Sequence, residues 1–198
     1  MISFYFIYQL LRRNAFIFSP QHNGGAMGII VPHVEDAETA RRAVAAAKYP
    51  PLGTRSVATL IPQLRAERWP AREAQAVINE DTSVIAMIES RAGLENVEAI
   101  AAVNGVDVLF IGTNDLCVDL GMPGQFDDPQ VDAAYRRVIA AARGHGKPAG
   151  IGGLATRPDL MARYVAMGAR FISVGSDVSF MLTAARQAAE TLRALPAG

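Results

Sequence analysis

The 198-residue sequence has a single cysteine, Cys117, and no excess of either charge, with 19 Lys and Arg residues against 19 Asp and Glu residues. One cysteine cannot form an internal disulfide or a cysteine-rich zinc site, which fits a reducing cytoplasm. Balanced charge gives no reason to expect a nucleic-acid groove or a patch for anionic membranes. No uninterrupted run of about 18 apolar residues is present, so a spanning helix is not expected. Because 51 % of the residues are apolar, the composition predicts a folded, soluble chain.

Two further absences concern chemistry. The sequence has no G-x-G-x-x-G turn and no Walker A loop, which weighs against nucleotide binding. It also has only two lysines, Lys48 and Lys147, and neither follows a predicted strand directly. A Schiff-base lysine at the end of a strand is therefore not indicated.

The first 23 residues differ from the rest of the chain. Residues 1–23 hold six of the thirteen Phe and Tyr residues and almost no alanine. Arg12 and Arg13 follow the apolar run, whereas a signal peptide carries its basic residues first. We interpret residues 1–23 as an atypical apolar leader, either an aberrant terminus or a strand and helix that cover apolar surface. An interfacial anchor is the alternative.

After Asn23, short apolar runs alternate with helical patterns. The runs predict strands over 28–32, 83–88, 106–111, 148–151 and 171–174. The intervening patterns predict helices after the N-cap Asp36, from Pro70 to about 80, a single helix through Leu94, Val97, Ile100 and Ala101, one after Asp128-Pro129, one through Leu160 to Val165, and one capped by Asp177. Five strand–helix repeats predict a parallel sheet. An open doubly wound sheet and a closed (β/α)₈ barrel both remain possible, because periodicity does not separate them.

Two acidic residues follow neighbouring strands of this sheet. Glu89 ends the 83–88 run, and Asp115 lies a few residues beyond the 106–111 run. Carboxyl ends of parallel strands share one rim, where two carboxylates suit a hard divalent cation such as Mg²⁺ or Mn²⁺. The alternatives are that Glu89 favours a helix N-terminus and that Asp115 makes an Asx turn or cap.

The turn Gly112-Thr113-Asn114-Asp115 is a candidate for anion binding, because a glycine turn after a strand directs backbone N–H groups outward. The 175–177 turn could do the same, although a plain helix cap is the favoured interpretation there. His33 follows the first strand, and we expect it at the rim rather than as a ligand.

Other candidates carry less chemistry. His22 and His145 are expected on the surface, and Cys117 has no neighbouring histidine to activate it. Residues 65–69 lie in a long loop and are interpreted as a lid, a subunit contact or a solvated face.

Several motifs occur in the order found in the HpcH/HpaI aldolase family. The chain resembles this family from about Gly24 to about Leu195, and the motifs are Val31-Pro32, 49–55 (YPPLGTR), 65–69 (RAERW), Met87-Ile88-Glu89-Ser90 and Gly112-Thr113-Asn114-Asp115-Leu116. The resemblance implies a metal-dependent aldolase such as 2-dehydro-3-deoxyglucarate aldolase or 4-hydroxy-2-oxoheptanedioate aldolase. It also implies a TIM barrel, usually assembled as a hexamer.

The resemblance assigns roles to particular residues. It implies that Glu89 and Asp115 bind a divalent metal, Mg²⁺ or Mn²⁺, which acts as a Lewis acid on a pyruvate enolate. It implies that backbone N–H groups of 113–115 receive the carboxylate of pyruvate or of a 2-keto acid that is cleaved to pyruvate and an aldehyde.

The departures from the family concern the missing first part of the barrel. The family's His in an Asp-Gly-Glu-His-like segment and its Arg after the third strand have no counterpart here, so no catalytic residue is identified. We therefore expect an α/β fold, an N-terminally truncated (β/α)₈ barrel that retains about the last five βα units, over residues 24–198. The alternatives to an active aldolase are an impaired remnant with only the metal rim, or a lyase for CoA thioesters like citrate lyase β-subunits.

Overall fold

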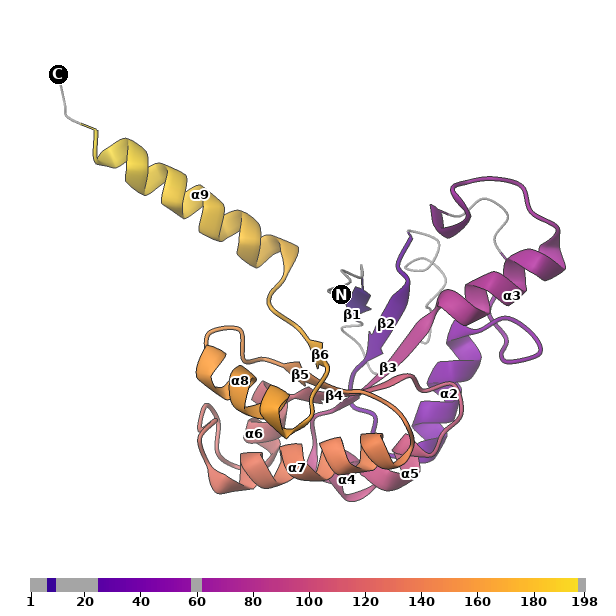
Figure 1. The fold of residues 1–198 in the computed structure, drawn as a ribbon, viewed down its shortest axis with the longest axis horizontal. Helices are drawn as coiled ribbons and strands as arrows, with labels where there is room; N and C mark the ends of the chain where they lie inside the picture. Colours follow the sequence, from indigo (N-terminus) through magenta and orange to yellow (C-terminus); the bar gives the residue numbers. More distant parts are fainter. Residues whose placement is uncertain (1–6, 10–24, 58–61, 196–198) are drawn as a thin grey trace.

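The structure is a computed structural model that describes residues 7–9, 25–57 and 62–195 (Figure 1). Its strands are β1 (Ile7–Gln9), β2 (Gly28–Val31), β3 (Ser83–Ile88), β4 (Val108–Gly112), β5 (Ala149–Gly152) and β6 (Phe171–Ile172). Its helices are α2 (Ala37–Ala47), the 3₁₀ helix η1 (Pro62–Leu64), α3 (Ala71–Asp81), α4 (Arg91–Glu95), α5 (Val97–Ala101), α6 (Thr113–Asp119), α7 (Pro129–Gly144), α8 (Pro158–Met167) and α9 (Asp177–Arg193).

The strands form one parallel sheet in the order β1-β2-β3-β4-β5-β6. Each strand therefore pairs with the next strand in the chain, as in the register of Ile85 with Val108 between β3 and β4. A doubly wound sheet reverses its strand order at a switch point, and this one does not. Because right-handed crossovers that all run one way place their helices on one face, the sheet is an arc of a barrel. In the part of the chain that is described, β1 and β6 are the two edges and the barrel is not closed.

Alternate residues of the strands face two separate cores. One face packs against the helices with side chains such as Ile29, Ile88 and Leu109. The other face holds the smaller cluster of Ile30, Ile85, Met87, Val108 and Phe110, with Phe171 packed against it. Both faces of the sheet are thus apolar, which explains why the strands read as continuous hydrophobic runs in the sequence.

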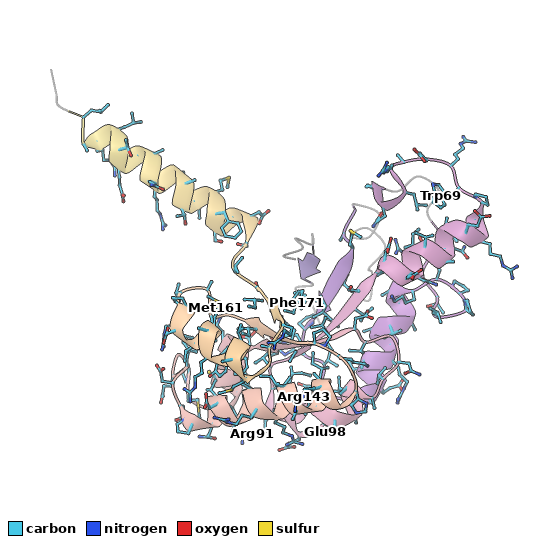
Figure 2. All side chains as sticks on the ribbon, in the orientation of Figure 1. Trp69, Arg91, Glu98, Arg143, Met161 and Phe171 are labelled. Atoms are coloured by element: carbon cyan, nitrogen blue, oxygen red, sulfur yellow. The ribbon has the colours of Figure 1, made fainter. Side chains whose placement is uncertain are left out.

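Glycines in β5 make room for the aromatic part of the smaller core. A Cβ at Gly150 or Gly152 would lie 2.6 or 2.4 Å from the ring of Phe110. The Phe110 ring also meets Phe171 edge to face, with 5.7 Å between ring centroids. Figure 2 shows Phe171 beside the sheet, well away from Trp69 on the arm that carries α3.

Helix boundaries follow the predicted caps in most places. The Asp36 side chain accepts from the Thr39 N–H at the start of α2, and Asp128 caps α7. The single helix expected through residues 94–101 is wrong, because the chain forms two short helices that meet at Asn96.

The cap of the last helix also differs from the prediction. Ser176, not Asp177, is the N-cap of α9, where Ser176 and Ser179 form a reciprocal capping box.

The expected leader and the last helix lie at opposite ends of the sheet order. Of residues 1–23, only 7–9 are described, and they form β1, which pairs with β2; the remainder of the leader lies outside the described residues. Helix α9 projects from the body of the protein (Figure 1), and none of its residues is buried. No helix in the described part is both long and apolar enough to cross a membrane.

Candidate metal and substrate site

Glu89 is held at the carboxyl end of β3. Its side chain is almost fully buried, with 3 % of the residue surface exposed. Its Oε1 accepts a hydrogen bond of 2.8 Å from the backbone N–H of His33 and lies 3.3 Å from His33 Nδ1. His33 has a φ of 50°, a left-handed conformation that costs energy for a residue with a side chain. The chain thus adopts a strained turn after β2 that presents an N–H group to the Glu89 carboxylate.

The other oxygen of Glu89 lies over the end of β4. A Cβ built on Gly112 would be 2.5 Å from Glu89 Oε2 and 2.9 Å from Glu89 Cβ. Only a glycine at position 112 lets β4 approach the carboxylate this closely. Gly112 therefore contributes to the site by the absence of its side chain.

Asp115 stands in the first turn of a helix rather than in an irregular turn. Residues 113–119 form α6, whose N-cap is Gly112 and whose first turn has no side-chain cap. The turn predicted over 112–115 is therefore corrected to a helix start, because α6 begins directly after the last residue of β4. The Asp115 side chain is exposed, and its charge is favourable near the positive end of a helix.

Glu89 and Asp115 line one cavity of about 310 Å³ at the rim of the sheet. Its wall also includes His33, Glu35 and Asp119. The structure thus brings the two predicted acids together and places His33 beside them, as expected. Glu35 and Asp119 were not predicted at this rim, although Asp119 follows Asp115 by one helical turn and that spacing signals a shared face.

A main-chain contact fixes the wall of the cavity. The Asp119 Oδ2 accepts a 2.6 Å hydrogen bond from the Arg91 N–H at the start of α4. The Ser90 hydroxyl caps the same helix by accepting from the Gly93 N–H. The ends of α6 and α4 are therefore tied together beside Glu89.

The side chain of Thr113 turns away from the cavity. Thr113 is fully buried, and its Oγ1 lies 2.6 Å from the Gly152 carbonyl oxygen and 2.7 Å from the Tyr135 hydroxyl. Only the backbone of Thr113 is therefore open to a role in ligand binding. The neighbouring Asn114 is exposed.

The donor set of this rim fits a hard divalent cation. Among the described residues, no group of three or more His, Cys, Asp and Glu side chains is arranged to hold a metal. Glu89 and Asp115 would therefore supply two oxygen ligands and leave the other positions to water and substrate oxygens, which is typical of Mg²⁺ sites. The bare backbone at Gly112 leaves Glu89 Oε2 close to the turn that carries Asp115.

The weaker candidates stay outside this site. His145 is exposed, and Cys117 is fully buried in α6, where burial raises the pKa of its thiol. Residues 65–69 are exposed on the arm before α3. In the 175–177 turn, Ser176 and Asp177 accept from the N–H groups of Ser179 and Val178, as a plain cap does. His22 lies outside the described residues.

The fold is an arc of a (β/α) barrel, and acidic residues lie at the carboxyl ends of its strands. Barrel enzymes place their active sites at this rim. The family model for HpcH/HpaI aldolase/citrate lyase matches residues 18–184, and the chain belongs to this family.

Curated relatives include two aldolases. The chain is 40 % identical over 169 residues to 5-keto-4-deoxy-D-glucarate aldolase of Klebsiella pneumoniae, and the match covers 85 % of this chain and 64 % of that protein. It is 41 % identical over 165 residues to a 4-hydroxy-4-methyl-2-oxoglutarate aldolase of Chaetomium globosum, covering 82 % and 61 % of the two chains. The chain therefore spans less than two thirds of the length of these relatives.

Solved structures agree with the fold. The HpcH/HpaI aldolase from Desulfitobacterium hafniense superposes with a TM-score of 0.79 at 30 % identity, over 96 % of this chain and 73 % of that chain. A family protein from Burkholderia cenocepacia gives 0.78 at 32 % identity, over 95 % and 73 %. The incomplete barrel predicted from the sequence is thus confirmed as the fold class.

Proposed function

We propose that this chain is a divalent-metal-dependent carbon–carbon lyase. The reaction is aldol cleavage of a 2-keto-3-deoxy sugar acid or a 4-hydroxy-2-oxo acid to pyruvate and an aldehyde. The observation that carries the proposal is the cavity that Glu89 and Asp115 share, beside the close approach of Glu89 to Gly112 at the end of β4. The names of the two aldolase relatives support the substrate class.

The two carboxylates share one role in this proposal, and a hydrogen bond orients one of them. Glu89 and Asp115 would hold Mg²⁺ or Mn²⁺, which supplies Lewis-acid stabilisation of negative charge on the pyruvyl oxygen when it is bound. The His33 N–H donates a hydrogen bond to Glu89 Oε1. This bond orients the carboxylate and directs Oε2 toward β4. Burial of Glu89 keeps competing water away from that oxygen.

The first turn of α6, directly after β4, receives the substrate carboxylate in this proposal. Residues 113–115 begin α6, and the first N–H groups of a helix have no acceptor within it. Among the described residues no side chain caps this helix, which leaves backbone N–H groups as donors for an anion. Gly112, Thr113, Asn114 and Asp115 are the residues proposed to bind the pyruvyl end.

The test measures metal binding and turnover separately. Isothermal titration with Mn²⁺ compares the wild-type chain with Glu89→Gln and Asp115→Asn, and both variants are expected to lose binding. Asp81→Asn, at the exposed end of α3, is the matched control and keeps wild-type affinity. A coupled assay then follows pyruvate release from both classes of keto acid.

The outcomes separate the alternatives. A folded wild-type chain that binds no Mn²⁺, or that binds equally well without either carboxylate, contradicts the proposed site. Metal binding without pyruvate release favours the impaired remnant. Cleavage of a CoA thioester in place of the free acids favours the citrate lyase-like alternative.

We also propose that the chain assembles with copies of itself. Helix α9 buries no side chain and exposes a set of large apolar residues: Val178, Phe180, Met181, Leu182 and Leu192. Val178, Met181, Leu182 and Leu192 recur at helical spacing and share one face of α9, and an exposed apolar face of this kind marks association sites in soluble proteins. Light scattering of the purified chain measures the assembled mass, and a monomer at all concentrations contradicts this part of the proposal.

A further inference from the structure

The Thr113 hydroxyl joins three elements next to the candidate metal site. Thr113 is the first residue of α6, Gly152 is the last residue of β5, and Tyr135 lies in α7. All three groups meet at Thr113 Oγ1, which is 2.6 Å from the Gly152 oxygen and 2.7 Å from the Tyr135 hydroxyl. Thr113 is the only one of the four residues proposed to bind substrate whose side chain is fully buried.

The direction of both hydrogen bonds follows from the chemistry of the groups. A carbonyl oxygen only accepts, so the single proton of the Thr113 hydroxyl goes to Gly152. The Tyr135 hydroxyl must then donate to Thr113 Oγ1. Burial raises the pKa of Tyr135 further above its usual value, so this donor stays protonated across the physiological range.

These bonds continue the β-sheet ladder one residue past its end. Gly112 and Gly152 are the last paired residues of β4 and β5. At the next position the chain enters α6, and the Thr113 side chain takes over the link to the Gly152 carbonyl. The junction between strand and helix is therefore fixed by a side chain where the backbone ladder stops.

The next residue rests on the same strand end. A Cβ at Gly153, which has a φ of 80°, would lie 2.9 Å from Asn114 Nδ2 and 3.3 Å from Asn114 N. The first turn of α6 is thus seated closely on the end of β5 at two successive residues. Asp115 is the residue that follows them.

The tyrosine is itself held in place. Its ring stacks on Tyr164 of α8 with 3.6 Å between centroids and 6° between planes. Among the described residues, the Tyr164 hydroxyl bonds to neither Thr113 nor Tyr135. Tyr164 therefore supplies a ring to the stack, while Tyr135 supplies both a ring and a donor.

We propose that Thr113 is a positioning residue, which acts with Tyr135 to set the first turn of α6 and so the place of the Asp115 carboxylate opposite Glu89. This rests on the proposed role of Glu89 and Asp115 as metal ligands. Groups that orient a ligand without touching the metal commonly change metal affinity by about 10–100-fold when they are removed.

The experiment compares four variants by Mn²⁺ titration and thermal unfolding. Thr113→Val keeps the shape of the side chain and removes the hydroxyl, so Mn²⁺ affinity is expected to fall by about 10–100-fold. Tyr135→Phe removes one of the two bonds and lowers affinity less. Thr113→Ser restores the hydroxyl and affinity close to wild type. Tyr164→Phe, in the same ring stack, leaves affinity unchanged.

Three outcomes decide the matter. Equal Mn²⁺ affinity in wild type and Thr113→Val, with only a lower midpoint of unfolding, makes the hydroxyl purely structural and overturns the inference. If Thr113→Val does not fold, Tyr135→Phe decides, and unchanged affinity there overturns it equally. A wild-type chain that binds no Mn²⁺ instead refutes the proposed function, and the positioning role with it.

Discussion

The close approach of β4 to Glu89 makes Gly112→Ala a sharp test of the site. Gly112 has a φ of −86°, which alanine adopts without backbone strain, so the effect of the change is steric. The new Cβ would lie 2.5 Å from Glu89 Oε2, about 0.9 Å inside the 3.4 Å at which ordinary contact begins. Glu89 cannot yield freely, because it is buried and its other oxygen is bonded to the His33 N–H at 2.8 Å.

The expected cost has two parts. Overpacking of a buried position commonly costs about 1–3 kcal/mol of stability. The cost of Gly112→Ala is expected within that range, because the new Cβ would also lie only 3.0 Å from Met87 Sδ. Displacement of the carboxylate is expected to weaken Mn²⁺ binding by about 10-fold or more. Chemical denaturation measures the first part, and calorimetric titration measures the second.

Gly144→Ala is the matched control. Gly144 closes α7, and a Cβ there would meet no atom of the described residues within 4 Å. This variant is expected to be as stable as wild type or more stable by about 0.5–1 kcal/mol, because alanine is the better helix former. Wild-type Mn²⁺ affinity in Gly112→Ala would refute the inference that Glu89 Oε2 over β4 faces the metal.

Three further predictions concern stability and assembly. Asp36→Ala removes the cap of α2 and is expected to cost about 1 kcal/mol of stability at pH 7. The hydrogen bond from the Thr39 N–H lowers the pKa of Asp36 below 3.8. In chemical denaturation, the stability difference between wild type and variant should therefore persist down to pH 3.8 and vanish as the pH falls through the lowered pKa. Arg55→Met replaces a buried guanidinium that has no hydrogen-bond partner among the described residues and is expected to raise the free energy of unfolding by about 1 kcal/mol. Destabilisation would instead show that the contact of the guanidinium with the Tyr49 ring, 4.6 Å from its centroid, outweighs the cost of burying the charge. Met181→Asp places a charge on the exposed apolar face of α9 and should lower the assembled mass in light scattering, and an unchanged mass would exclude this face from the interface.

The sheet and its acidic rim were accessible from sequence because their signals are local. Buried strands give short apolar runs, and Glu89 directly follows such a run. Caps such as Asp36 and Asp128 are marked by residue type and by the helical pattern that follows them. Periodicity alone did not give the strand order, because a doubly wound sheet and a barrel arc share it and differ only in which strands pair; the resemblance to a barrel family supplied the order.

The details of the site depend on contacts between distant residues. Tyr135 lies within the helix predicted after Asp128-Pro129, and nothing local shows that its hydroxyl reaches Thr113. The strained His33 N–H, which bonds a carboxylate 56 positions further along the chain, leaves no local pattern either. Helix α6 was missed because it is short and begins at a glycine without a side-chain cap.

The single cysteine is a built-in probe of how often α6 opens. Cys117 lies on α6, two residues beyond Asp115, with none of its surface exposed. A thiol reagent reacts with the thiolate and needs direct access, so it modifies Cys117 only in molecules whose α6 has lifted from the sheet. The rate of labelling therefore counts openings of the helix that carries the Asp115 carboxylate, without an engineered probe. A ligand that bridges Asp115 to Glu89 would lower the rate at which Cys117 is labelled.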